Sequence, residues 1–128
     1  NDLNKPGITD EEKTNIIIID FHAEATSEKK AMGFLLDGKV NLVFGTHTHV
    51  QTADDILLPK GTAYITDIGM TGPKDSIIGA DKSIVITSFL TEIPEKRPVA
   101  SGECIFNGII IDIDDETNNT NSISRISL

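Results

Sequence analysis

Two short runs of β-branched and aliphatic residues, 15–21 and 40–45, lie on either side of a segment with helical spacing. Each run is too short for a helix and is bounded by polar residues, which predicts buried strands. Between them, Ala31, Phe34 and Leu35 recur on one helix face, so AEATSEKKAMGFLLDGK predicts a helix. A strand, a helix and a strand in this order form a βαβ unit, whose two strands run parallel.

The remainder of the chain continues the α/β pattern. Residues 62–69 predict a third strand, and a Gly/Pro-rich loop follows it. Residues 81–91 are compatible with a helix or a strand, and the capping aspartate at their start favours the helix. Residues 103–113 and 122–128 predict a hairpin whose connecting sequence is DDETNNTN. All of these elements fit one domain.

The chain has three histidines, and all of them follow or end the two strands of the βαβ unit. His22 ends the first strand, whereas His47 and His49 follow the second in the sequence GTHTH. Parallel strands present their carboxyl ends at one edge of the sheet, where open α/β sheets bind ligands. We therefore expect His22 to lie near the other two histidines.

This arrangement favours metal binding over the ordinary role of a strand-end histidine, which is packing or contact with solvent. Imidazole is a common ligand of zinc, iron and manganese. In extended backbone His47 and His49 would point to opposite sides, which suits two ions better than one. A two-metal site also needs a bridging carboxylate. The carboxylates near predicted strand ends are Asp20, Glu24, Asp54, Asp55 and Asp67.

Composition excludes several other functions. The net charge is −9, with 20 acidic and 11 basic residues, so an extended nucleic-acid surface is not expected. No apolar run is long enough to cross a membrane. The single cysteine, Cys104, fits a reducing compartment, and we expect a cytoplasmic protein. An acidic protein that acts on a phosphate needs a bound cation to offset the negative charge.

The sequence GTHTHVQTAD resembles the late histidine motif of the calcineurin-like metallophosphoesterases. Together with DFHAEATSEK, DIGMTGP and SGECIFNGIIIDID, it is similar to a bacterial branch of small 2′,3′-cyclic-nucleotide phosphodiesterases. The resemblance extends over residues 15–128. It implies an α/β fold in the form of an α/β/β/α sandwich of the metallo-dependent phosphatase type, with a dinuclear site at the strand ends.

The same resemblance implies roles for the histidines. His22 and His47 would bind one metal ion and His49 a second, with iron or manganese as the metals and zinc as an alternative. A hydroxide between the ions would attack the phosphorus of a small nucleotide phosphodiester. No substrate-binding residue is assigned, and a homo-oligomer is left open.

The chain departs from the family pattern at its start. The family's other ligands (an Asp, a bridging Glu and an Asn) and its general-acid His have no counterpart here, so no catalytic residue is assigned. We therefore interpret residues 1–14 as a linker from an upstream segment and residues 15–128 as the C-terminal half of the domain. The expected partner is the missing N-terminal half, without which the fragment would be inactive.

Three alternatives are compatible with the same motifs. The first is a metallophosphoesterase relative of the capsule-synthesis type, against which DIGMTGP argues. The second is a non-catalytic module with one structural zinc or none. The third is a regulatory protein that senses or controls nucleotide signalling.

Overall fold

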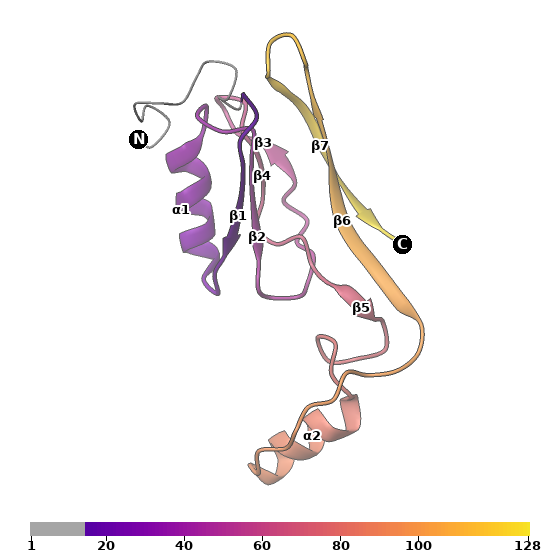
Figure 1. The fold of residues 1–128 in the computed structure, drawn as a ribbon. Coiled ribbons are helices and arrows are strands. Elements are labelled where there is room, and N and C mark those ends of the chain that lie inside the picture. The colour runs from indigo at the N-terminus through magenta and orange to yellow at the C-terminus, as the bar shows by residue number, and fades with distance from the viewer. Residues whose placement is uncertain (1–14) are drawn as a thin grey trace, which may run out of the picture.

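The computed structural model describes residues 15–128, which form two sheets and two helices (Figure 1). The mixed α/β class predicted from the sequence is confirmed. The linker predicted at residues 1–14 lies outside the described residues. Within residues 15–128, no helix is both long and apolar enough to cross a membrane.

The first sheet has four strands in the order β1-β2-β4-β3. β1 pairs in parallel with β2, and β2 pairs in parallel with β4, as the βαβ pattern predicts. The register places His22 opposite Thr46, so the ends of β1 and β2 lie side by side. The four strands are β1 (Ile18–His22), β2 (Leu42–Thr46), β3 (Ile56–Leu57) and β4 (Ala63–Ile65).

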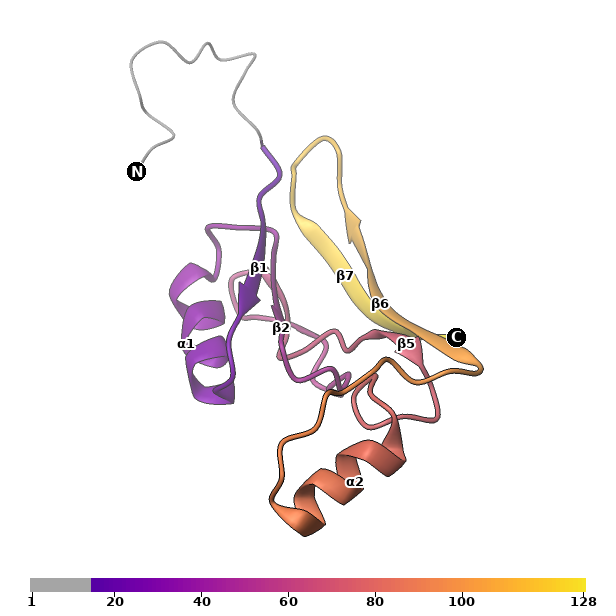
Figure 2. The ribbon, with the colours of Figure 1, turned by 60° about the horizontal axis from the view of Figure 1, so that its bottom comes forward.

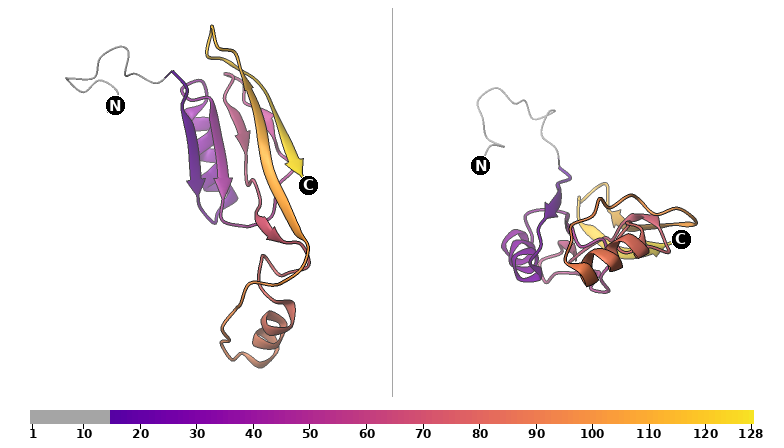
Figure 3. Two further views of the ribbon diagram at one scale, coloured as in Figure 1. Left: turned by 45° about the vertical axis from the view of Figure 1, so that its right-hand side comes forward. Right: turned by 90° about the horizontal axis from the view of Figure 1, so that it is seen from below.

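Helix α1 (Thr26–Leu36) is the crossover between β1 and β2 and covers one face of this sheet (Figure 3). Gly33 allows the helix to approach closely, because a Cβ atom there would lie 2.6 Å from the Tyr64 ring. The core behind the helix contains Val43, Leu58 and Tyr64. Burial of this apolar face holds the helix on the sheet.

The prediction that the first strand is buried is wrong for β1. Its residues alternate between exposed and half-buried, and Ile18 is 51% exposed. The physical reason is its position, because among the described residues β1 pairs only with β2 and forms one edge of the sheet. An apolar strand of this kind is typical of a sheet interior rather than of an edge.

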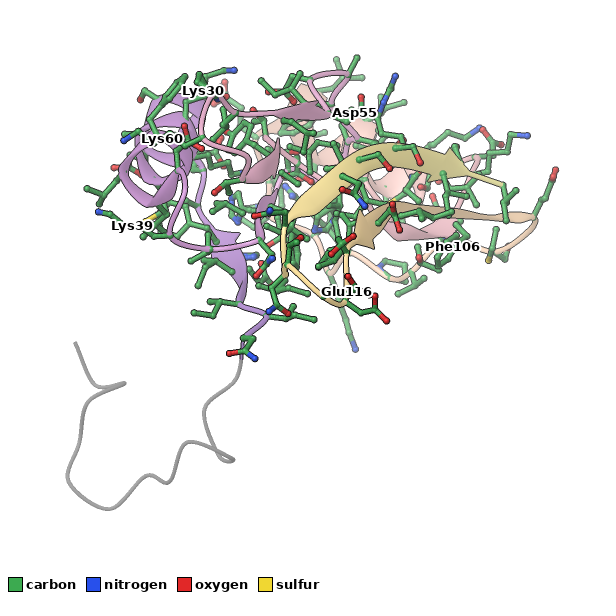
Figure 4. The ribbon with its side chains drawn as sticks, turned by 90° about the horizontal axis from the view of Figure 1, so that it is seen from above. Lys30, Lys39, Asp55, Lys60, Phe106 and Glu116 are labelled. Carbon is green, nitrogen blue, oxygen red and sulfur yellow. The ribbon has the colours of Figure 1, made fainter. Side chains whose placement is uncertain are left out.

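The second sheet has the order β5-β6-β7 and contains the predicted hairpin. Its strands are β5 (Thr71–Pro73), β6 (Cys104–Ile113) and β7 (Thr120–Ser127). β7 packs against β3 and β4 of the first sheet. Arg125 on β7 donates from Nε to Asp55 Oδ1 at 2.7 Å, and Figure 4 shows Asp55 beside the hairpin. The hairpin therefore lies on the side of the first sheet opposite to α1 (Figures 1 and 3).

Helix α2 (Lys82–Thr91) confirms the choice of helix over strand at residues 81–91. The Asp81 side chain caps it by accepting hydrogen bonds from the backbone N–H groups of Ser83 and Ile84. The helix stands apart from both sheets at the end of the molecule near β5 (Figure 2).

Candidate metal centre

The structure brings His22 and His47 into contact at the carboxyl edge of the parallel strands. His22 is the last residue of β1, and His47 follows β2 directly. The Nε2 atom of His22 lies 3.0 Å from the Nδ1 atom of His47. The two rings meet edge to face, with centroids 4.8 Å apart. The convergence expected for these two residues is therefore present.

The outer nitrogen of His22 is held by a hydroxyl group. His22 Nδ1 lies 2.9 Å from Thr46 Oγ1, and that hydroxyl donates its hydrogen to Asp20 Oδ1 at 2.9 Å. Because the hydroxyl has only one hydrogen, its oxygen must accept from His22 Nδ1–H. This assigns the tautomer in which His22 Nε2 carries a lone pair.

The outer nitrogen of His47 is held by a carboxylate. His47 Nε2 lies 2.6 Å from Glu24 Oε2, and an ionised carboxylate can only accept. His47 therefore donates from Nε2, and its Nδ1 atom faces His22 Nε2 at 3.0 Å. A proton between these two inner nitrogens makes an N–H···N hydrogen bond, and a metal ion would take the place of that proton. Two nitrogens bound at right angles to one ion at about 2.1 Å lie about 3 Å apart, so the spacing fits a metal ion.

The loop after β2 is not extended, and the prediction of extended backbone at His47 and His49 is wrong. Their φ angles are 109° and 65°, in the left-handed region that residues other than glycine rarely adopt. The Thr48 N–H group between the two histidines donates to Asp67 Oδ2 at 2.9 Å, and this hydrogen bond holds the loop in its sharp turn. Such strained backbone is concentrated at functional sites.

His49 does not join the other two histidines in one ligand cluster. Its Nδ1 atom lies 2.9 Å from the Ile78 carbonyl oxygen, to which it donates, so Nε2 is left as its lone-pair nitrogen. Within residues 15–128, no group of three or more His, Cys, Asp or Glu side chains is arranged to hold a metal ion. The Nε2 atom of His49 is the ring nitrogen that the hydrogen bond to Ile78 does not use.

Gly45, near the end of β2, allows the chain that leaves β4 to approach closely. A Cβ atom at this position would lie 1.8 Å from the Thr66 carbonyl oxygen, so no side chain fits. The Gly45 carbonyl also accepts a hydrogen bond from Ile68 N–H at 3.0 Å. The end of β2 and the segment after β4 are therefore packed directly on each other.

A buried ion pair beneath the loop is the feature that sequence reasoning missed. Lys29 and Asp67 are 1% and 0% exposed, and Lys29 Nζ lies 2.9 Å from Asp67 Oδ2. Asp67 Oδ1 accepts from Gly69 N–H. Burial raises the pKa of the Asp67 carboxyl, but its hydrogen bonds from Thr48 and Lys29 outweigh that effect and hold it below its usual value.

The remaining candidate carboxylates have other partners. Burial raises the pKa of Asp54, but hydrogen bonds from Thr66 and Thr52 outweigh it and hold that pKa at about 2. Asp55 pairs with Arg125. Of the five carboxylates singled out in the sequence, only Asp20 and Glu24 therefore lie beside the histidine pair.

Two adjoining cavities open beside His49. One has a volume of about 690 Å³ and is lined by His49, Asn107 and Arg125 among others. The second, of about 360 Å³, is mostly apolar and includes Met70 and Val99. These volumes are in the range of small-molecule sites. A third cavity, of about 370 Å³, lies at the opposite edge of the sheet, away from the histidines.

The sequence matches a known family, described as YmdB-like protein, over residues 4–126. A 2′,3′-cyclic-nucleotide 2′-phosphodiesterase of Bacillus subtilis (strain 168) is 56% identical over 114 residues, which are 89% of this chain and 43% of that protein. A putative phosphatase/phosphodiesterase of Mycoplasma pneumoniae is 46% identical over 101 residues, 78% of this chain and 36% of its own length.

Two crystal structures have the same fold. A hypothetical protein from Thermus thermophilus matches with a TM-score of 0.86 and 42% identity, over 92% of this chain and 46% of that one. A novel phosphatase from Mycoplasma pneumoniae matches with a TM-score of 0.85 and 42% identity, over 89% and 41%. The chain therefore spans less than half the length of the relatives that it matches.

Proposed function

Because the chain belongs to the YmdB-like protein family, we propose that it forms part of a metal-dependent phosphodiesterase that hydrolyses 2′,3′-cyclic nucleotides. The observation that carries this proposal is the pair of ring nitrogens, His22 Nε2 and His47 Nδ1, which face each other at 3.0 Å at the carboxyl ends of two parallel strands. The name of the Bacillus subtilis relative supports the reaction and the substrate class.

In this proposal His22 and His47 hold one metal ion through Nε2 and Nδ1, and His49 holds a second through Nε2. Iron or manganese is the expected metal, and zinc is the alternative. When bound, such a pair of ions supplies an activated water nucleophile and offsets the phosphate charge. The chain's own contribution is to orient the imidazoles, through the Thr46 hydroxyl for His22 and through Glu24 for His47.

The remaining ligands and the general acid are proposed to come from the rest of the longer protein, as its N-terminal half. Two observations on residues 15–128 support this view: no three His, Cys, Asp or Glu side chains there converge on one point, and the apolar strand β1 pairs there only with β2. We propose that this segment completes the α/β/β/α sandwich and that residues 15–128 alone are inactive. The exposed free Cys104 fits the reducing cytoplasm that we propose as the location.

The test uses the full-length protein. Metal analysis should find two ions per chain, and the protein should hydrolyse 2′,3′-cyclic AMP. His47→Ala should lose metal and activity but retain the circular dichroism spectrum of the wild type. Glu28→Ala, on the exposed surface of α1, should retain both metal and activity. One tightly held zinc without hydrolysis would instead support a structural module, and the function proposed here would be wrong.

A further inference from the structure

The buried carboxylate of Asp67 is bonded to the residue that separates the two loop histidines. Its Oδ2 atom accepts from Thr48 N–H and from Lys29 Nζ, each at 2.9 Å, and its Oδ1 atom accepts from Gly69 N–H at 2.9 Å. A fully buried carboxylate with three donors is fixed in position. The backbone of Thr48 is therefore held at a defined point between His47 and His49.

The backbone of Asp67 holds the other end of the same loop. Thr52 N–H donates to the Asp67 carbonyl at 3.0 Å, and Asp67 N–H donates to Thr52 Oγ1 at 2.9 Å. One residue thus bonds to the loop at position 48 and at position 52. Thr48 and Thr52 therefore cannot move away from Asp67 without breaking at least one of these hydrogen bonds.

The loop needs such an anchor because its conformation is unfavourable. Two residues other than glycine with positive φ, His47 and His49, cost of order 1–3 kcal/mol each. Lys29 is required in turn, because a buried carboxylate without a counter-charge would take up a proton or move toward solvent. The carboxylate, the ammonium group and the loop form one connected unit.

We propose that Asp67 and Lys29 are positioning residues that set the separation and orientation of His47 and His49 as ligands of two different metal ions. This inference rests on the proposed function. It predicts that the buried pair controls metal affinity although neither side chain binds metal. Hydrogen-bonded groups behind metal ligands typically alter affinity by about 10- to 100-fold.

The experiment compares Asp67→Asn with Asp37→Asn in the full-length protein. Asp37 is a matched control because it is a buried carboxylate that accepts hydrogen bonds from the Lys60 and Thr62 N–H groups, at the end of the sheet away from the histidines. Both variants should unfold at lower temperature than the wild type. At a temperature at which both are folded, Asp67→Asn should bind Mn²⁺ about 10- to 100-fold more weakly, and Asp37→Asn should bind it as the wild type does.

A second variant covers the case in which Asp67→Asn does not fold. Asp67→Glu keeps the charge for Lys29 but displaces the carboxylate from Thr48, so it should also weaken Mn²⁺ binding. Wild-type affinity in a folded Asp67 variant would overturn the positioning role while leaving the proposed function intact. A wild-type protein that binds no Mn²⁺ and hydrolyses no cyclic nucleotide would overturn both.

Discussion

His22 and His47 face each other through their inner ring nitrogens. The His22 Nε2 and His47 Nδ1 atoms are 3.0 Å apart, while Thr46 and Glu24 hold the opposite sides of the two rings. These two acceptors fix the orientation of both rings, as outer hydrogen bonds do for histidines that bind metal ions.

Glu24 should control metal binding through the orientation of His47. Replacement of Glu24 by Ala in the full-length protein removes the acceptor at His47 Nε2, and the imidazole can then turn or change tautomer. We expect Mn²⁺ affinity to fall about tenfold, at the low end of such effects because Glu24 is largely exposed. Titration with Mn²⁺ measures the change.

Glu28→Ala is the control for this change, because it removes another exposed carboxylate from the start of α1. It should leave Mn²⁺ affinity unaltered. Equal losses in both variants would mean that Glu24 acts only through general electrostatic attraction, which added salt would then abolish.

Gly45 should tolerate no side chain. Gly45→Ala would place a Cβ atom 1.8 Å from the Thr66 carbonyl oxygen, so the end of β2 and the segment after β4 must separate. We expect a loss of about 3 kcal/mol in the free energy of unfolding, measured with urea on the full-length protein. Gly72→Ala is the control, because the nearest atom to its Cβ would be 3.9 Å away. Equal stability of the two variants would contradict the close approach of Thr66 to Gly45.

The sequence was sufficient to predict the elements whose signals are local. The periodicity of residues 15–45 predicts β1, α1 and β2, and Asp81 marks the start of α2. The parallel pairing then brings the ends of β1 and β2 together, which is why the contact between His22 and His47 was expected.

Features that depend on contacts between distant segments were not predictable. β3 and β5 are two and three residues long, which is too short for a periodic signal in the sequence. They are strands because they pair with β4 and β6. The positive φ at His47 depends on the bond between Thr48 and Asp67, on another loop. Lysine is usually a surface residue, so burial of Lys29 was not expected. Lys29 precedes Gly33 by one helical turn, however, and this spacing places it on the helix face that packs on the sheet.

Asp54 should contribute stability that is lost in acid. Its pKa is held at about 2 in the folded state, below the ordinary value of 3.8. The folded state therefore binds the proton less readily, and the contribution is complete above about pH 4 and disappears as the pH falls toward 2. Since the side chain is 29% exposed, we expect about 2 kcal/mol at pH 7.

Unfolding in urea between pH 7 and pH 2 measures this contribution as the difference between the wild type and Asp54→Asn. The difference should shrink between pH 4 and pH 2, because protonated Asp54 loses the charge that its hydrogen bonds favour. A difference that stays constant over this range would show that Asp54 acts through shape rather than through charge.

Lys29 should be far more important for stability than its neighbour Lys30. Lys29→Met leaves the Asp67 carboxylate buried without a counter-charge, at a cost of about 3–5 kcal/mol. Lys30→Met removes only a 47% exposed ammonium group that lies 3.3 Å from Asp54, so its cost should stay below about 1 kcal/mol. Asp67→Asn should lower the free energy of unfolding by less in the Lys29→Met background than in the wild type, because it then removes the carboxylate charge that Lys29→Met leaves unpaired. Urea unfolding of the wild type, Lys29→Met, Asp67→Asn and the double variant gives the coupling energy, and strictly additive losses would contradict a direct Lys29–Asp67 interaction.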